Sequence, residues 1–402
     1  MKHLLYCIAI FLCSCADSHT NAGTSPVLLD FGKGLQHATT PKLSVYCSAI
    51  EYIPLETNSQ SVIAFVLPHR MEFDNNYAYI IDPMSKQCKR FDKTGKYLGN
   101  IGNTGNGPGE FWNPAGPYTD LKTGEVFFFE SRQLFRFTSD GSFLQTIPLD
   151  SLYEPYTFIR KLGPLENGCF SGVREYPGKH KLSFIQFDLT GKLTYQYDQT
   201  DNVNSSTKNS ETIRLDNGTE VMGTTNVKYH IYTYNKGIYF FSQLNDTIFV
   251  FYSKDKKKPG YLQYWGKYTE TTTERKNKNY SRLNTAPIET DAAIFFNFSF
   301  NTGDIPYLKP GTLKGAGMYD KTNRTLSAIA YDPHYDATGL QNDLDNGAPF
   351  WPDKISGNKL YRFLNASEFI SLSEKSNSAP MKKVAGTLTE HSNPVMIVAT
   401  LK

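Results

Sequence analysis

The 402-residue chain has few cysteines outside its first residues. Three of the six lie within the first fifteen positions, which leaves Cys47, Cys88 and Cys169 for the rest of the chain. So small and odd a set excludes a disulfide framework, and no paired Cys or His/Cys cluster indicates a zinc site. One disulfide stays open as an alternative, but we favour three buried thiols that pack as small apolar side chains.

An excess of charge and long helical patterns are lacking as well. The chain has 42 basic and 39 acidic residues, and this near-balance argues against a nucleic-acid-binding surface. Aromatic residues, in contrast, make up 14% of the chain, and there are 30 Gly and 21 Pro. Aromatic and β-branched residues between Gly, Asn and Asp turns are typical of many short strands, so we predict an all-β fold.

The N-terminus has the pattern of an export signal. A single Lys precedes an apolar run that ends near Leu12, and this run is too short for a membrane-spanning helix. Leu12-Cys-Ser-Cys15 fits the lipobox of bacterial lipoproteins. The resemblance implies that residues 1–14 are a signal peptide and that Cys15 is lipidated, which makes the membrane a partner. An ordinary secretory signal with a coincidental Cys is the alternative.

The next segment differs in composition from the rest of the chain. Residues 15–40 are rich in Ser, Thr, Asn, Gly and His, which predicts a flexible tether between lipid and folded domain. The acidic cluster of a surface-export signal does not follow Cys15, so the leaflet stays open. We therefore predict an exported, lipid-anchored protein of the bacterial cell envelope, with the outer membrane favoured.

One pattern recurs along the chain. An aromatic residue is followed four positions later by Gly and then by apolar residues, at Phe91, Phe137 and Phe187. Weaker copies near residues 252, 319 and 363 bring the number to six; in one of them Asn323 replaces Gly, as a left-handed turn position allows. Repeats at this interval predict one six-bladed β-propeller over residues 41–402, with four-stranded antiparallel blades.

A propeller must be closed by its two ends. Residues 50–55 and 394–401 have the composition of strands, and we expect them in the same or adjacent blades. Near-continuous apolar runs such as 125–130 indicate strands that are buried on both faces. The polar segments Asn204–Gly223 and Thr269–Ala286 are expected to be insertions in blades 4 and 5.

Several segments together resemble a known family. Phe91-Asp-Lys-Thr-Gly-Lys is followed by Gly105-Asn-Gly-Pro-Gly-Glu-Phe111, and the segments 51–56, 340–352 and 393–402 match the same group. From about residue 42 onward, the chain resembles NHL-type six-bladed propellers, in particular the propeller lipoproteins of Bacteroides and its relatives. The resemblance implies a fold and a cellular location. It implies no activity, because most members have none assigned.

Catalytic motifs are absent from the sequence. No phosphate loop, dinucleotide fingerprint or nucleophile elbow occurs in its proper context. Lyases on six-bladed NHL propellers use a metal and His residues around the channel. By that resemblance His69, His230 and His334, which fall in different blades, are the weak candidates for metal ligands. We predict no cofactor, although a divalent metal such as calcium or zinc stays open.

One polar patch has the composition of a ligand site. Asn342, Asp343 and Asp345 precede Trp351, and carboxylates beside an exposed aromatic ring can bind sugars. The same residues also suit an Asx-rich turn with a Trp packed beneath it, and we favour this alternative. The leading hypothesis is an envelope binding module for a glycan, peptide or partner protein. The alternative is a metal-assisted lyase or hydrolase with its site in the central channel.

Overall fold

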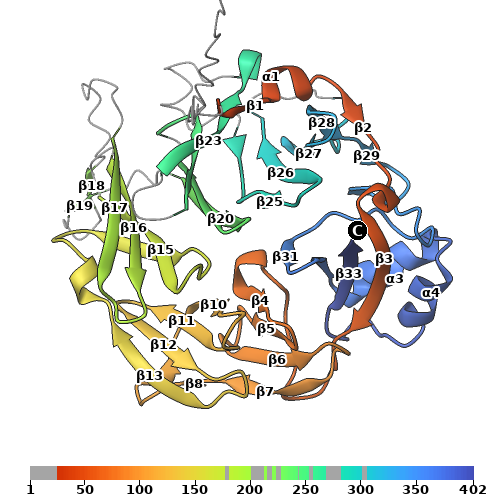
Figure 1. The fold of residues 1–402 in the computed structure, drawn as a ribbon. Helices are drawn as coiled ribbons and strands as arrows, with labels where there is room; N and C mark the ends of the chain where they lie inside the picture. The colour runs from red at the N-terminus through yellow and green to blue at the C-terminus, as the bar shows by residue number, and fades with distance from the viewer. Residues whose placement is uncertain are drawn as a thin grey trace, which may run out of the picture.

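The structure is a ring of small antiparallel sheets around one axis (Figure 1). It is a computed structural model that describes residues 25–176, 181–200, 212–214, 220–222, 228–242, 244–252, 257–268, 282–300 and 306–402. The predicted lipidation site, Cys15, lies outside these residues. Six sheets of four or more strands form the blades, which confirms the predicted all-β, six-bladed propeller.

The first three blades follow one another along the chain, and each begins with its innermost strand. Blade 1 consists of β4 (Met71–Phe73), β5 (Tyr77–Ile81), β6 (Cys88–Asp92) and β7 (Tyr97–Ile101). Blade 2 consists of β10 (Ala115–Thr119), β11 (Val126–Glu130), β12 (Gln133–Phe137) and β13 (Phe143–Pro148). Blade 3 consists of β14 (Phe158–Leu162), β15 (Cys169–Glu175), β16 (Lys181–Asp188) and β17 (Leu193–Thr200).

The last three blades take additional strands from the N-terminal segment. Blade 4 consists of β20 (Tyr229–Tyr234), β21 (Gly237–Ser242), β22 (Thr247–Phe251), β23 (Lys257–Tyr264) and β1 (Val27–Asp30). Blade 5 consists of β24 (Arg282–Leu283), β25 (Ile288–Glu289), β26 (Ala293–Ser299), β27 (Lys314–Asp320), β28 (Thr325–Ile329) and β2 (Ala38–Thr39). Blade 6 consists of β31 (Lys354–Ser356), β32 (Lys359–Leu364), β33 (Val395–Leu401) and β3 (Cys47–Pro54).

The two ends of the chain close the ring as predicted. β3 is the outermost strand of blade 6 and pairs antiparallel with the C-terminal strand β33, from Cys47 opposite Leu401 to Pro54 opposite Val395. The last blade is thus completed by a strand from the beginning of the chain.

The recurring motif forms the outer turn of a blade. In blade 1, Asp92 Oδ1 accepts hydrogen bonds from the N–H groups of Thr94 and Lys96, and Gly95 adopts a left-handed φ of 86°. A Cβ on Gly95 would lie 2.2 Å from the carbonyl oxygen of Pro54, at the end of the neighbouring blade's outer strand. Gly is therefore required twice, for the backbone conformation and for the close contact between blades.

Two details of the repeat differ from the prediction. In blade 5 the left-handed residue is Arg324, with a φ of 55°, and not Asn323. Asn323 instead donates from its N–H and from Nδ2 to the carboxylate of Asp320, because the turn after β27 has a different shape. The weak copy near residue 363 forms no tight turn: β32 is followed by helices α3 (Ala366–Lys375) and α4 (Ala379–Ala385), whose apolar residues pack against the blade 6 core.

The N-terminal segment also differs from the predicted tether. From residue 27 onward it is part of the propeller, since β1 pairs parallel with β23 and β2 pairs parallel with β28. The fully buried side chains of Leu29, Phe31 and Leu35 hold it against blades 4 and 5. The polar average of residues 15–40 concealed these apolar residues, which are spaced to face one core.

Other expectations concern the core and the insertions. Cys47 and Cys88 are buried, in agreement with the favoured prediction, whereas Cys169 is only half-buried. The segment Asn204–Gly223 lies between blades 3 and 4 and contains the hairpin of β18 (Thr212–Arg214) and β19 (Glu220–Met222). Most of Thr269–Ala286 is outside the described residues.

Candidate functional site

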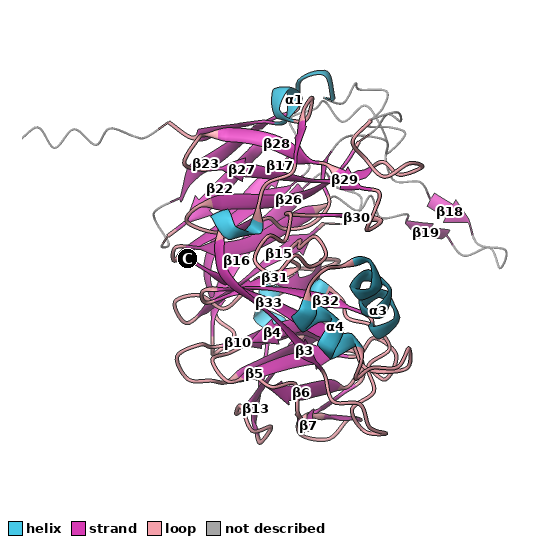
Figure 2. Ribbon diagram, turned by 90° about the vertical axis from the view of Figure 1, so that its right-hand side faces the viewer, coloured by secondary structure: helices cyan, strands magenta, loops and turns pink. Residues whose placement is uncertain are grey.

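The two faces of the ring are built differently. Strands alternate in direction, so the turns between first and second strands and between third and fourth strands share one face, and all of them are short. We call this the short-turn face. The connections between blades and between second and third strands share the opposite, long-loop face. Helices α3 and α4 and the β18–β19 hairpin project on the same side of the ring (Figure 2). Irregular segments of this kind are where propellers and similar scaffolds place binding residues.

Four basic side chains come from the innermost parts of three blades. His69 and Arg70 belong to the short helix η2 (Pro68–Arg70) that leads into β4, Lys161 to β14 and Lys354 to β31. We call these four residues the axial cluster. Lys354 Nζ lies 2.9 Å from Glu72 Oε2 of blade 1, so an ion pair spans the closure of the ring.

Arg70 is only partly satisfied by the protein. Its Nη2 donates to Asn113 Oδ1 at 3.2 Å, which fixes the guanidinium between blades 1 and 2. Its Nη1 is enclosed and has no hydrogen-bond partner among the residues that the structure describes. A guanidinium nitrogen held in this way retains the capacity to donate to an acidic or carbonyl group.

The members of the axial cluster influence one another electrostatically. Partial burial lowers the pKa of His69 below its usual 6.5, and the charges of Arg70, Lys161 and Lys354 lower it further. The pKa of Lys161 is lowered because neighbouring protein removes part of the water around its ammonium group, although Glu175 counteracts this effect. Like charges that depress a histidine pKa show an excess of positive potential, which suits an anionic ligand.

The carboxylates near the cluster are already engaged. Glu72 pairs with Lys354. Glu175 accepts from Arg160 Nε and from the Tyr229 hydroxyl, both at 3.0 Å. His69 and Lys161 are exposed to solvent, so the basic groups remain accessible while the acidic groups are occupied.

The polar patch of the sequence prediction forms a hydrogen-bonded turn. Asp345 Oδ1 accepts from Asn342 Nδ2 at 2.7 Å, from Tyr52 Oη at 3.2 Å and from Gly347 N at 3.1 Å. Asp343 lies apart from them and accepts from the N–H and hydroxyl of Ser44, at 2.9 and 2.6 Å. The structure thus brings Asn342 and Asp345 together but not Asp343.

Trp351 belongs to the core between blades 5 and 6. Its side chain is buried, its Nε1 donates to Asn297 Oδ1 at 3.0 Å, and its ring meets Phe295 edge-on at 5.4 Å. In this conformation the indole is part of the hydrophobic core.

The three candidate histidines do not meet. His69 belongs to the axial cluster, whereas His230 is buried in β20 with its ring 5.1 Å from that of Phe241. His334 lies at the surface, where its Nε2 is 2.9 Å from the carbonyl oxygen of Lys375. Among the described residues no three His, Cys, Asp or Glu side chains are grouped as metal ligands. The lyase or hydrolase hypothesis therefore gains no support from this geometry.

No local sequence pattern indicates the axial cluster. Arg70, Lys161 and Lys354 lie on three short segments far apart in the sequence, and only ring closure brings them together. The available hint was positional: each lies at or beside the first strand after a long connection, where a propeller strand borders the axis.

Fold and inner-strand geometry define the class of this protein as a six-bladed β-propeller with a cationic axial cluster. Residues 27–400 match the family described as domain of unknown function DUF4934, and the chain belongs to this family. No curated protein matches the chain. Among the described residues, no helix is both long and apolar enough to cross a membrane.

Two solved structures with the same fold come from Bacteroides species. A Bacteroides fragilis protein described as exported superposes with a TM-score of 0.65 at 15% identity, over 93% of this chain and 99% of its own. A DUF4221 family member from Bacteroides vulgatus has a TM-score of 0.50 at 12% identity, over 89% of this chain and 97% of its own. At these identities the similarity shows the fold alone.

Proposed function

We propose that this protein is an exported, lipid-anchored binding module of the bacterial cell envelope, and that it holds an acidic ligand at the axial cluster. The ligand is an acidic glycan, peptide or partner-protein segment. The observation that carries the proposal is the electrostatic imbalance near the axis: accessible His69 and Lys161 beside the partly satisfied Arg70, with both neighbouring carboxylates engaged.

The orientation of the N-terminal segment indicates which face of the propeller a lipid anchor would hold toward the membrane. β1 runs parallel to β23, which begins at the short-turn face, so the chain enters the propeller from that face. The thirteen residues from Cys15 to Val27, which are twelve residue steps, span at most ~43 Å when fully extended. A lipid on Cys15 would hold the short-turn face toward the membrane, and the long-loop face would point away from it.

The anchor is tested by expression of the full chain and of its Cys15→Ala variant. We expect the wild type in the membrane fraction with incorporated fatty acid, and the variant without fatty acid and released from the membrane. Equal labelling of both forms would contradict lipidation at Cys15.

Ligand binding is tested with an array of acidic and neutral oligosaccharides together with acidic peptides. We expect retention of acidic probes that weakens as salt is raised, since screening acts on exposed charges. The Lys161→Gln variant should bind less, whereas Lys122→Gln, a loss of the same charge on the short-turn face, should bind normally. Retention of neutral probes alone, or equal binding by both variants, would contradict the proposal.

A further inference from the structure

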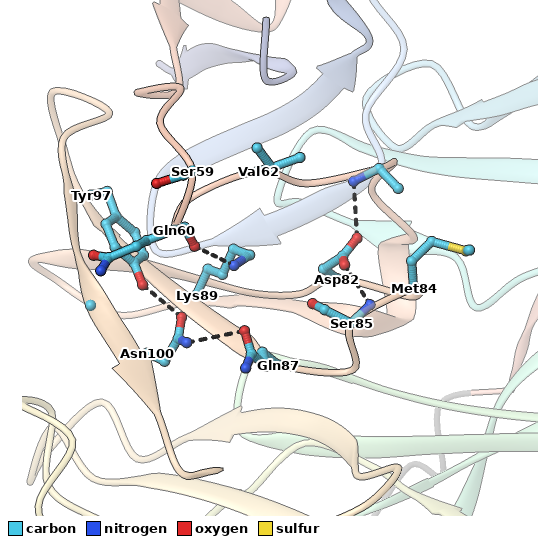
Figure 3. A pocket seen from close by; sticks show the side chains of 12 residues that line it. Ser59, Gln60, Val62, Asp82, Met84, Ser85, Gln87, Lys89, Tyr97 and Asn100 are labelled. Atoms are coloured by element: carbon cyan, nitrogen blue, oxygen red, sulfur yellow. Dashed lines mark hydrogen bonds between the residues drawn. The ribbon is translucent and has the colours of Figure 1, made fainter. Parts of the chain in front are cut away.

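A second site lies on blade 1, away from the axial cluster. Strands β6 and β7 and the long-loop-face segments 59–64 and 82–87 enclose a pocket of about 660 Å³ (Figure 3). This volume is within the range of small-molecule sites and is large enough for a monosaccharide. Its side chains are mostly amides and hydroxyls, and its rim carries the exposed apolar side chains of Val62 and Met84.

Lys89 is the unusual residue of this pocket. Its side chain is only 3% exposed, and lysines buried to this degree are normally paired with a carboxylate. Lys89 Nζ instead donates to the carbonyl oxygen of Gln60 at 2.6 Å and lies 5.9 Å from the centre of the Tyr97 ring. No ion pair joins it to any residue in the described part of the chain. Two of the three N–H donors of the ammonium group therefore have no hydrogen-bond acceptor among the described residues.

The nearest carboxylate is used elsewhere. Asp82 Oδ1 accepts from the N–H of Ala64 at 2.9 Å, and its Oδ2 accepts from the N–H of Ser85 at 2.7 Å. These bonds hold both loops of the pocket in place. Asp82 is near enough to favour the charged form of Lys89, although burial lowers the pKa of this lysine overall. A buried ammonium group with two free donors is stabilised most by an anionic partner.

The opposite wall is formed by a chain of hydrogen bonds. Tyr97 Oη donates to Asn100 Oδ1 at 2.7 Å, and Asn100 Nδ2 donates to Gln87 Oε1 at 3.2 Å. Figure 3 shows these three side chains on one side of Lys89 and Asp82 on the other. Amide and hydroxyl groups fixed in this way match the hydroxyls of a sugar, and the apolar rim matches its C–H groups.

We propose that this blade 1 pocket binds an acidic monosaccharide unit, with the sugar carboxylate on Lys89 Nζ and the hydroxyls on Asn100 and Gln87. The pocket shares no residue with the axial cluster, so its failure in a test would leave the proposed function intact. The sugar carboxylate accepts hydrogen bonds from the Lys89 ammonium group, while the amide side chains of Asn100 and Gln87 distinguish a sugar acid from a simple organic acid.

The test uses isothermal titration calorimetry of the full chain with glucuronate, glucose and acetate. We expect glucuronate to bind at least about tenfold more tightly than either of the other two, since a charge-assisted hydrogen bond contributes a factor of this order. Glucose bound as tightly as glucuronate would overturn the role of Lys89. Acetate bound as tightly as glucuronate would show that the pocket does not recognise the sugar hydroxyls. Absence of glucuronate binding would overturn the proposal as a whole.

Three variants assign the effect. Lys89→Met keeps the length and apolar stem of the side chain and should weaken glucuronate binding about tenfold or more. Lys96→Met removes an exposed lysine of the same blade and should bind as the wild type does. Asn100→Ala, at an exposed position, should weaken glucuronate but leave acetate unchanged, which keeps the proposal testable if Lys89→Met does not fold. Unaltered glucuronate binding by both Lys89→Met and Asn100→Ala would refute it.

Discussion

Lys354 and Glu72 form a 2.9 Å ion pair that joins the inner strand of the last blade to that of the first. The outer strands of the same closure are held by the pairing of β3 with β33. The ring is thus closed at two radii, by main-chain hydrogen bonds outside and by a partly buried charge pair near the axis. The inner contact also determines how much positive charge the axial cluster presents, because it neutralises one of its lysines.

Removal of one partner of this pair should destabilise the ring. We expect Lys354→Met to lower the free energy of unfolding by about 1–3 kcal/mol, because Glu72 is left partly buried without its cation. Glu72→Gln combined with Lys354→Met should recover part of the loss. Urea unfolding of the two single variants and the double variant gives the coupling energy. Strictly additive effects would show that the pair contributes nothing to closure.

Substitution of Gly95, the glycine of the recurring motif, tests two contributions to stability, the left-handed backbone conformation and the close contact between blades. Gly95→Ala places a Cβ at a φ of 86° and 2.2 Å from the carbonyl oxygen of Pro54. Gly168→Ala is the matched control, since its φ is 72° but no atom lies within 4 Å of the added Cβ.

We expect Gly168→Ala to cost about 1–2 kcal/mol for the left-handed backbone alone. Gly95→Ala should cost about 1–3 kcal/mol more, because the neighbouring blade must shift. Denaturant midpoints measure the difference. Equal costs for both variants would mean that the glycine serves the turn only and not the contact between blades.

The sequence was sufficient for features that are encoded locally. Phe91 and Gly95 recur with the same spacing at Phe137 and Gly141 and at Phe187 and Gly191, because these outer turns need a buried aromatic and a left-handed residue. Near residue 363 the same search found a strand with the right aromatic residues, but the next segment is helical. Phe369 is buried against the blade 6 core, a pattern that a search for strands does not detect.

The candidate sites depend on contacts that no local pattern contains. In the sequence, Lys89 looks like an ordinary strand residue. Only the fold places Gln60 beside it from another segment and buries it without a carboxylate partner. The polar turn near Asp345 had an obvious composition, yet the carboxylates of Asp343 and Asp345 already accept hydrogen bonds within the fold. Composition identifies polar residues but does not show which of them have capacity left for a ligand.

His69 should titrate below its usual pKa. In the folded protein, burial and the charges of Arg70, Lys161 and Lys354 all lower the pKa of His69 below 6.5. The imidazole is therefore neutral at neutral pH. The unfolded chain then binds more protons between the two pKa values, and stability is lost as the pH falls below about 6.5. Lys161→Gln should raise the pKa of His69. Imidazole NMR signals followed against pH measure it, and a wild-type pKa at or above 6.5 would contradict the electrostatic picture.

Phe31 should be essential to the N-terminal segment, although it falls within the polar stretch that resembles a tether. Its side chain is fully buried, stacks on Trp265 with ring centres 4.3 Å apart, and meets Phe296 edge-on at 5.2 Å. Phe31→Ala should therefore cost about 3–5 kcal/mol in urea unfolding. Leu28→Ala, on the neighbouring strand β1 but 53% exposed, should change stability by no more than about 0.5 kcal/mol. If both variants unfold like the wild type, the segment is a tether after all and the propeller begins only at β3. If Phe31→Ala alone is destabilised, the segment around Phe31 belongs to the folded propeller, and the proposed lipidation site at Cys15 lies only 16 residues before this anchoring side chain.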